Sequence, residues 1–191
     1  ELEPGTIYDI NRFTVPALLT ALGCSVTDLG IYPDNLDAIQ EGLAGASHDH
    51  DLILTSGGVS KGEEDHVRTA VDKLGALHTW NLLIKPGRPI ALGHIDDAGR
   101  QVPFIGLPGN PVAVMVTFLK VARPIVRLLS GARALDQNLY QIFAGFSFIK
   151  KPGRREWLRC RLEKDGDGYL CAIKYPDDGS GILASMVASD G

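Results

Sequence analysis

The sequence predicts an α/β fold in which a mixed or parallel sheet lies between two layers of helices. Between residues 11 and 131, apolar runs of strand length alternate with segments whose apolar residues recur at helical spacing. The chain has 191 residues, of which 45% are hydrophobic and 22% charged. This size and composition are typical of a globular protein with one ordinary domain and a small second one.

Each element follows from its local pattern. Asn11 and Asp34 are the expected N-caps of the first two helices, and Pro124 is expected to kink or stop the last one. The expected helices cover residues 11–22, 34–43, 63–75 and 111–130. The expected strands cover residues 25–29, 51–54, 77–84, 89–93 and 102–105, with a turn at residues 97–99.

The pattern changes after residue 135. Residues 140–149, 156–162 and 169–175 are short β-type runs separated by Gly-rich turns. We expect an α/β domain over residues 1–134 and a small, incomplete β-barrel over residues 135–191. Both ends of the sequence resemble loops, so we expect a part of a longer protein.

Composition and charge argue against several classes. The net charge of −4 creates no general attraction for nucleic acid or an anionic membrane. The longest apolar stretch, residues 111–119, is far shorter than the ~20 residues that span a bilayer. The three cysteines are widely spaced, which disfavours a disulfide framework or a structural zinc site. We therefore expect a cytoplasmic enzyme with neither nucleic acid nor a membrane as partner.

The loop of residues 55–65 (TSGGVSKGEED) lies between an expected strand and an expected helix. Its glycines allow backbone N–H groups to approach an anion, and the following helix N-terminus favours negative charge. The acidic residues at its end have two explanations. They hold a divalent cation such as Mg²⁺, or they only complement the helix dipole.

Two further loops follow strands, and all three loops are expected to converge on one crevice. Residues 85–89 (KPGRP) place two cations three residues apart in a rigid turn, which suits an oxyanion, although for this turn taken alone two solvated surface charges are the simpler explanation. Residues 106–111 (GLPGNP) join a strand to the long helix. Asn110 there is either a helix cap or a reader of a polar ligand edge.

These motifs together resemble one enzyme family. Residues 7–12 (IYDINR), 55–65, 84–89 and 106–112 occur in the order found in the molybdopterin molybdotransferases, which include bacterial MoeA and the E domain of gephyrin. Residues 153–159 (GRREWLR) and 179–185 (GSGILAS) resemble the C-terminal barrel of that family. The resemblance implies a molybdopterin-binding α/β domain, followed by the barrel.

The resemblance also implies a reaction. Adenylylated molybdopterin and molybdate are the substrates, Mg²⁺ assists cleavage of the adenylate, and AMP is released. Full-length members carry further N-terminal domains and act as homodimers, with the molybdopterin adenylyltransferase as a further expected partner.

Site residues are carried over by position. Asp65, Lys85 and Arg88 are the implied catalytic residues, and Asp65 and Glu63 the implied metal ligands. The implied contacts to molybdopterin or adenylate are Tyr8, Asp9, Ser56, Gly57, Gly58, Ser60 and Asn110. The implied molybdate contacts are Lys85, Arg88, Pro89, Arg154 and Ser180. Arg88 departs from the family, whose second cation is usually lysine, so its planar guanidinium closes the clamp differently.

Three other functions are compatible with parts of the sequence. A molybdopterin adenylyltransferase shares the α/β domain, but the β-type tail and the KPGRP turn argue against it. A scaffold that binds a receptor peptide needs a groove that the sequence cannot show. A nucleotide hydrolase of the competence/damage type is the most distant alternative.

Overall fold

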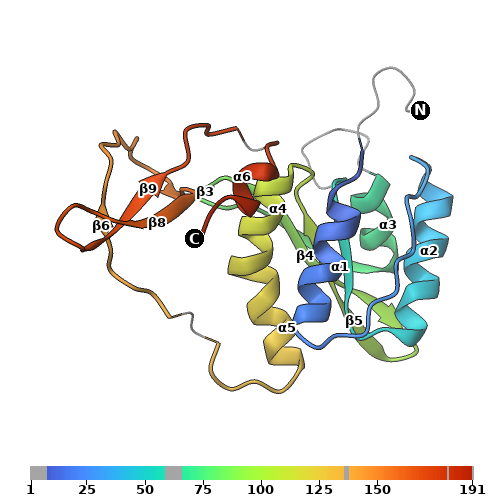
Figure 1. Cartoon of the computed structure of the whole chain (residues 1–191). Coiled ribbons are helices and arrows are strands. Elements are labelled where there is room, and N and C mark those ends of the chain that lie inside the picture. Colours follow the sequence, from blue (N-terminus) through green and yellow to red (C-terminus); the bar gives the residue numbers. More distant parts are fainter. Residues whose placement is uncertain (1–7, 59–65, 136–137, 180, 191) are drawn as a thin grey trace.

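The computed structural model describes residues 8–58, 66–135, 138–179 and 181–190, and Figure 1 shows how its elements are arranged. The helices are α1 (Asn11–Ala21), α2 (Leu36–Asp49), α3 (His66–Leu74), α4 (Pro111–Thr117), α5 (Arg123–Leu129) and α6 (Ala184–Val187). The strands are β1 (Ile53–Ser56), β2 (Gly75–Asn81), β3 (Ile84–Lys85), β4 (Pro89–Asp97), β5 (Arg100–Leu107), β6 (Phe143–Ala144), β7 (Arg155–Glu156), β8 (Cys160–Lys164) and β9 (Leu170–Lys174).

The central sheet is mixed, with the strand order β1-β5-β4-β2. Strand β1 runs parallel to β5, whereas β4 pairs antiparallel with both β5 and β2. Ala98 and Gly99 form the turn between β4 and β5 with φ values of 48° and 86°, as a two-residue hairpin with the twist of a type I′ turn requires. The predicted mixed sheet and the predicted turn are confirmed.

Helices cover both faces of this sheet because β5 is apolar on both sides. Val102 and Phe104 belong to one core, which packs against α2 and α3. Ile105 and Leu107 belong to the other core, together with residues of α1, α4 and α5. The alternation of side chains along a strand explains this division. The predicted three-layer arrangement of the α/β part is confirmed (Figure 1).

The long apolar helix predicted from residue 111 continues past Pro124. A π-helical turn, Phe118–Ala122, lies between α4 and α5. Because proline has no N–H to donate to the preceding turn, the wider π turn accommodates Pro124 without ending the helix. No helix in the described parts of the chain combines the length and the apolarity that a membrane span needs.

The strand predicted over residues 25–29 is wrong. These residues are exposed and belong to no helix or strand, and none of them makes a backbone hydrogen bond to the backbone of another described residue. Their alternating apolar pattern is that of a strand, but a strand needs a neighbour with which to pair.

Both predicted helix caps are also wrong, each by a short shift along the chain. Asn35, not Asp34, caps α2, since its Oδ1 accepts a hydrogen bond from the backbone N–H of Ala38 at 3.1 Å. Asn11 is the first residue of α1 rather than its cap. Instead, Oδ1 of Asp9 accepts a hydrogen bond from the backbone N–H of Arg12 at 3.2 Å.

The C-terminal part differs from the prediction as well. Strands β6, β9 and β8 form a three-stranded sheet, and β7 pairs with β3 of the first part. The described residues contain no closed barrel. A closed barrel requires more strands than these three, with a consistent stagger between neighbours. The run predicted over residues 140–149 contributes only Phe143–Ala144, and the short helix α6 occurs in a part that was predicted to be all-β.

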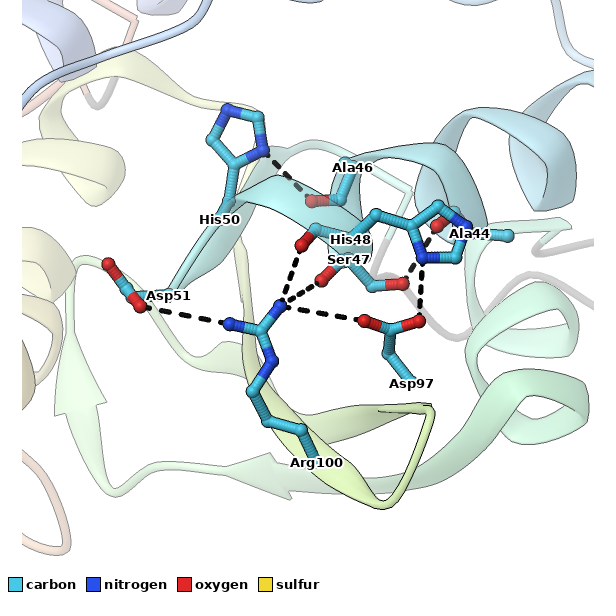
Figure 2. Close-up of polar contacts among 8 residues, drawn as sticks. All are labelled: Ala44, Ala46, Ser47, His48, His50, Asp51, Asp97 and Arg100. Carbon is cyan, nitrogen blue, oxygen red and sulfur yellow. Dashed lines mark hydrogen bonds and ion pairs between the residues drawn. The ribbon is translucent and has the colours of Figure 1, made fainter.

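A charged network fastens the β4–β5 turn to the end of α2 (Figure 2). Arg100 Nη2 donates to the carbonyl oxygens of Ser47 at 2.6 Å and His48 at 3.0 Å. Asp97 accepts from His48 Nδ1 at 2.6 Å and lies 3.5 Å from Arg100. Carbonyls at a helix C-terminus have no partner within the helix, so the guanidinium stabilises both the helix end and the turn.

We predict that Arg100→Met lowers the free energy of unfolding by about 1–3 kcal/mol, because two carbonyls and Asp97 lose a charged donor. Arg68→Met is the matched control, since Arg68 forms an exposed i,i+4 pair with Asp72. We expect the control to cost less than about 0.5 kcal/mol. Urea denaturation of both variants measures the difference, and equal losses would contradict the role given to Arg100.

Candidate functional site

A cleft of about 670 Å³ opens where three loops meet. Residues 57–58 follow β1, residues 85–89 follow or end β3, and residues 108–110 follow β5. Residues 156–159 and Asp178, from the C-terminal part, also line the cleft. The structure therefore brings together the three loops that the sequence predicts to converge, and the C-terminal part adds a further wall to the cleft.

The turn of residues 85–89 packs tightly against α4. The Lys85–Pro86 peptide bond is cis, and Gly87 has a φ of 96°. A Cβ atom on Gly87 would lie 2.6 Å from Cγ2 of Thr117, so this close approach and this backbone conformation both require glycine. The backbone N–H of Leu82 donates to the carbonyl of Arg88 at 2.8 Å and closes the loop.

Both predicted cations of this turn line the cleft, but their surroundings differ. Lys85 lies opposite Glu156 in the parallel β3–β7 pair, and its Nζ is 3.5 Å from Oε2 of Glu156. The Glu156 side chain is only 9% exposed, whereas that of Lys85 is 48% exposed. Arg88 is exposed, and no described residue makes an ion pair or hydrogen bond with its guanidinium. The charge of Arg88 is thus available to an anion.

The glycine loop and Asn110 form the opposite side of the cleft. Gly57 and Gly58 have φ values of 86° and 65°, and the N–H of Gly57 donates to the carbonyl of Leu107 at 3.0 Å. Asn110 occupies the N-cap position of α4, yet its side chain makes no capping hydrogen bond. An exposed amide at this place can donate to and accept from a ligand.

Asn11 supports this side of the cleft from below. Its Nδ2 donates to the carbonyl of Gly109 at 2.7 Å, and the residue is only 6% exposed. Gly109 in turn approaches Gly57, since a Cβ on Gly109 would lie 3.9 Å from Cα of Gly57. Helix α1 therefore positions the two loops through Asn11, a role that its expected position as a helix cap did not indicate.

Arg159 organises the C-terminal wall. Its guanidinium donates to the carbonyls of Gly179 at 2.9 Å and Asp177 at 2.8 Å, and to Oγ of Ser185 at 2.7 Å. It also lies 5.9 Å from the ring of Tyr175. These contacts use its donors to hold residues 177–179 beside the cleft, so its main effect is on the shape of the wall.

Asp178 carries negative charge at the edge of the cleft. A hydrogen bond from Lys174, 2.8 Å long, lowers the pKa of Asp178 below its ordinary value of 3.8. Partial burial opposes this shift, and the positive charges of Lys174, Lys85 and Arg159 add to it. Three cations and two carboxylates therefore line the cleft of a protein whose net charge is −4.

Some predicted site residues lie elsewhere. Pro89 lines the cleft, whereas Tyr8, Asp9, Ser56 and Arg154 are not among its lining residues. Asp9 and Ser56 line a second groove that shares Gly57 and Gly58 with the cleft. The predicted residues Ser60, Glu63, Asp65 and Ser180 lie outside the described residues.

The described residues contain no group of three or more His, Cys, Asp or Glu side chains that could hold a metal ion. The carboxylates expected to bind Mg²⁺ belong to residues 59–65, which the structure does not describe. The cleft residues Glu156 and Asp178 pair with Lys85 and Lys174 instead.

Comparisons with known proteins identify the two parts of the chain. Residues 1–128 match the family model described as "Probable molybdopterin binding domain", and residues 142–191 match "MoeA C-terminal region (domain IV)". The chain is 44% identical over 190 residues to a "Molybdopterin molybdenumtransferase" of Haemophilus influenzae, covering 99% of this chain and 46% of that protein. It is 36% identical over 156 residues to a protein of the same name from Nostoc sp., covering 81% and 36% respectively.

A solved structure supports the same assignment. The molybdopterin biosynthesis MoeA protein from Pyrococcus horikosii aligns with a TM-score of 0.71 and 26% sequence identity. The alignment covers 100% of this chain and 44% of that one. The chain thus spans less than half the length of these relatives.

Fold and matches together define an α/β domain of the molybdopterin-binding class that is followed by a small C-terminal β region. The chain belongs to the MoeA family. This membership connects it with molybdenum cofactor biosynthesis.

We predict that Lys174→Met raises the pKa of Asp178 towards 3.8, because the carboxylate loses its hydrogen-bonded cation. A carboxyl group with a lowered folded-state pKa stabilises the protein above its unfolded-state pKa and loses this effect as the pH falls through the folded-state value. The variant should therefore be less stable than the wild type near neutral pH. As the pH falls below 3.8, the stability of the variant should decrease less than that of the wild type. NMR titration of the Asp178 carboxyl measures the shift, with Lys164→Met on β8 as control; an unchanged pKa in Lys174→Met would contradict the assigned cause.

Proposed function

We propose that the protein is a molybdopterin molybdotransferase, which inserts molybdenum from molybdate into adenylylated molybdopterin and releases AMP. The observation that carries this proposal is the cleft between the α/β domain and the C-terminal part, with the cations Lys85 and Arg88 on a packed turn. The family membership and the names of the relatives support the choice of substrates.

The cleft suits an anionic substrate for electrostatic reasons. Fixed cations in a preorganised site stabilise an anion without the cost of reorganising solvent. Arg88 offers its guanidinium without a competing carboxylate among the described residues, whereas an anion must compete with Glu156 for Lys85. We therefore assign the first contact with molybdate to Arg88 and a second one to Lys85, with Pro89 shaping the turn between them and the sheet.

The other roles follow from position. Gly57, Gly58 and Asn110 are proposed to bind the pterin phosphate or adenylate, because their backbone conformation and open amide suit oxygen-rich ligands. Ser60 is proposed to bind the same group. Tyr8, Asp9 and Ser56 are proposed to contact the molybdopterin or adenylate where it extends beyond the cleft. Arg154 and Ser180 are the proposed molybdate contacts of the C-terminal part.

Glu63 and Asp65 are the proposed ligands of Mg²⁺, which would spread charge at the phosphoric anhydride. We further propose cytoplasmic location, division of the chain at residues 134 and 135, a homodimer in the full-length protein, and contact with the adenylyltransferase that supplies the substrate. These proposals rest on the family resemblance.

The reaction is tested by incubating the full-length protein with adenylylated molybdopterin and Mg²⁺, with and without molybdate. We expect AMP release that depends on molybdate. Asp65→Ala should abolish this release and leave the circular dichroism spectrum unchanged, because only the proposed metal ligand is removed. Substrate binding without any AMP release by the wild type would instead favour a scaffold.

The anion clamp has its own test. Arg88→Met should reduce molybdate-dependent AMP release by about 100-fold or more, since one preorganised charge is lost. This variant is cleaner than one at Lys85, whose removal would leave the buried carboxylate of Glu156 unpaired. Lys73→Met, on the exposed side of α3, is the control and should retain full activity. Equal activity of the two variants would contradict the clamp.

A further inference from the structure

The carboxylate of Glu156 lines the cleft beside Lys85 and Arg88, the two cations of the anion clamp. The Glu156 side chain is 9% exposed, and its Oε2 lies 3.5 Å from Nζ of Lys85. Within the described parts of the chain, Lys85 is the only cation that pairs with this carboxylate. A buried carboxylate without a counterion is strongly destabilising, so Glu156 depends on Lys85.

The backbone on both sides of Glu156 is fixed by strand pairing. The N–H of Arg155 donates to the carbonyl of Leu83 at 2.8 Å, and the N–H of Trp157 donates to the carbonyl of Lys85 at 2.9 Å. Glu156 lies between these two hydrogen bonds and directly opposite Lys85 in the β3–β7 pair. The position of the carboxylate is therefore set by the strand pair rather than by the ammonium group.

The lysine is the more mobile member of this ion pair. Its side chain is 48% exposed, and it ends in an ammonium group on a flexible four-carbon stem. The ammonium can therefore turn from the carboxylate towards an anion in the cleft. An anion gains the contact with Lys85 only in competition with Glu156, and the fixed negative charge of Glu156 also repels the anion.

Asp178, the other carboxylate of the cleft, does not act on the clamp in this way. Its ion-pair partner Lys174 lies 2.8 Å away and is not among the residues that line the cleft. The Asp178 side chain is 55% exposed, so solvent screens its charge more than that of Glu156. Loss of the Asp178 charge would release no cation of the clamp, whereas loss of the Glu156 charge would release Lys85.

We propose that Glu156 is a positioning residue for the anion clamp: it holds Lys85 in the empty cleft and weakens the binding of molybdate before the reaction. This inference rests on the proposed function, in which the molybdenum must leave the clamp to reach the pterin. A clamp that binds the substrate as strongly as the transition state lowers KM without raising kcat. The carboxylate limits this unproductive binding, because Lys85 returns to Glu156 when the anion leaves.

Anion binding to the full-length protein tests the proposal without the reaction. Calorimetric titrations use sodium molybdate, a dianion, and sodium perrhenate, a tetrahedral monoanion. Glu156→Gln removes the charge and keeps the size of the side chain. We expect the affinity for molybdate to rise about 10-fold or more and that for perrhenate to rise by a smaller factor, because Coulomb energy scales with the charge of the ligand. Unchanged affinities, or equal gains for the two anions, would overturn the proposal.

Two further variants separate the ion pair from the overall charge of the cleft. Asp178→Asn removes an equal charge without releasing Lys85, so we expect the affinity for molybdate to rise about 3-fold at most. Glu156→Asp retains the carboxylate and should bind molybdate nearly as the wild type does. Glu163→Gln, on strand β8 at a side chain that is 50% exposed, is the matched control and should change neither affinity. Equal gains from Asp178→Asn and Glu156→Gln would overturn the role given to the Lys85 pair.

The kinetics of AMP release provide a second readout. Glu156→Gln should lower both KM for molybdate and kcat, because it stabilises the bound substrate more than the transition state. A substitution that only disturbed the packing of the cleft would raise KM instead. A higher KM, or a lower KM with an unchanged kcat, would contradict the proposed role of Glu156.

Arg88→Met distinguishes failure of this inference from failure of the proposed function. If Arg88→Met weakens molybdate binding and Glu156→Gln leaves it unchanged, the role of Glu156 is overturned and the clamp remains. If neither substitution changes molybdate binding, the clamp and the role of Glu156 are overturned together.

Discussion

The two-sided burial of strand β5 is the constraint on which the rest of the structure depends. Its side chains alternate between a core shared with α2 and α3 and a core shared with α1, α4 and α5. This alternation fixes which helices lie on which face, and it directs the chain at the end of β5 into the loop at Gly109 and Asn110. The parallel partner β1 ends beside it, so the glycine loop arrives at the same place. The cleft is therefore a consequence of core packing before any ligand is considered.

Sequence patterns predicted the features of the fold that depend on residues close together in the chain. The helices, the sheet type, the turn at Ala98 and Gly99 and the convergence of three loops follow from spacing, glycine conformations and the rule that strand ends collect loops. Contacts between segments that are distant in the sequence could not be predicted, because no local pattern indicates them. Asn11 meets Gly109 98 positions along the chain, and Lys85 meets Glu156 only because β3 pairs with β7. The pattern of residues 25–29 predicted a strand that the structure does not form, because a strand also needs a neighbour with which to pair.

The charges of the cleft are arranged in pairs of unequal strength. Glu156 is buried beside an exposed Lys85, and Asp178 is held by Lys174, so each carboxylate has a dedicated cation. Arg88 stands apart from these pairs, and Arg159 is committed to carbonyl groups and a hydroxyl. Arg88 and Arg159 thus carry the positive charge that no paired carboxylate offsets, and of the two only the Arg88 guanidinium has its donors free among the described residues, which explains how an acidic protein can attract an anion at one place.

The pairing of β3 with β7 has a mechanical consequence. Two residues from each strand, with hydrogen bonds from Arg155 to Leu83 and from Trp157 to Lys85, join the C-terminal part to the turn that carries the cations. Because Lys85 and Glu156 form the last register pair of this short seam, the contacts that join the two parts lie directly beside the cleft. A molecule that contacts both walls of the cleft therefore helps to hold the two parts together. The seam in turn favours binding of that molecule, because it keeps the two walls in place.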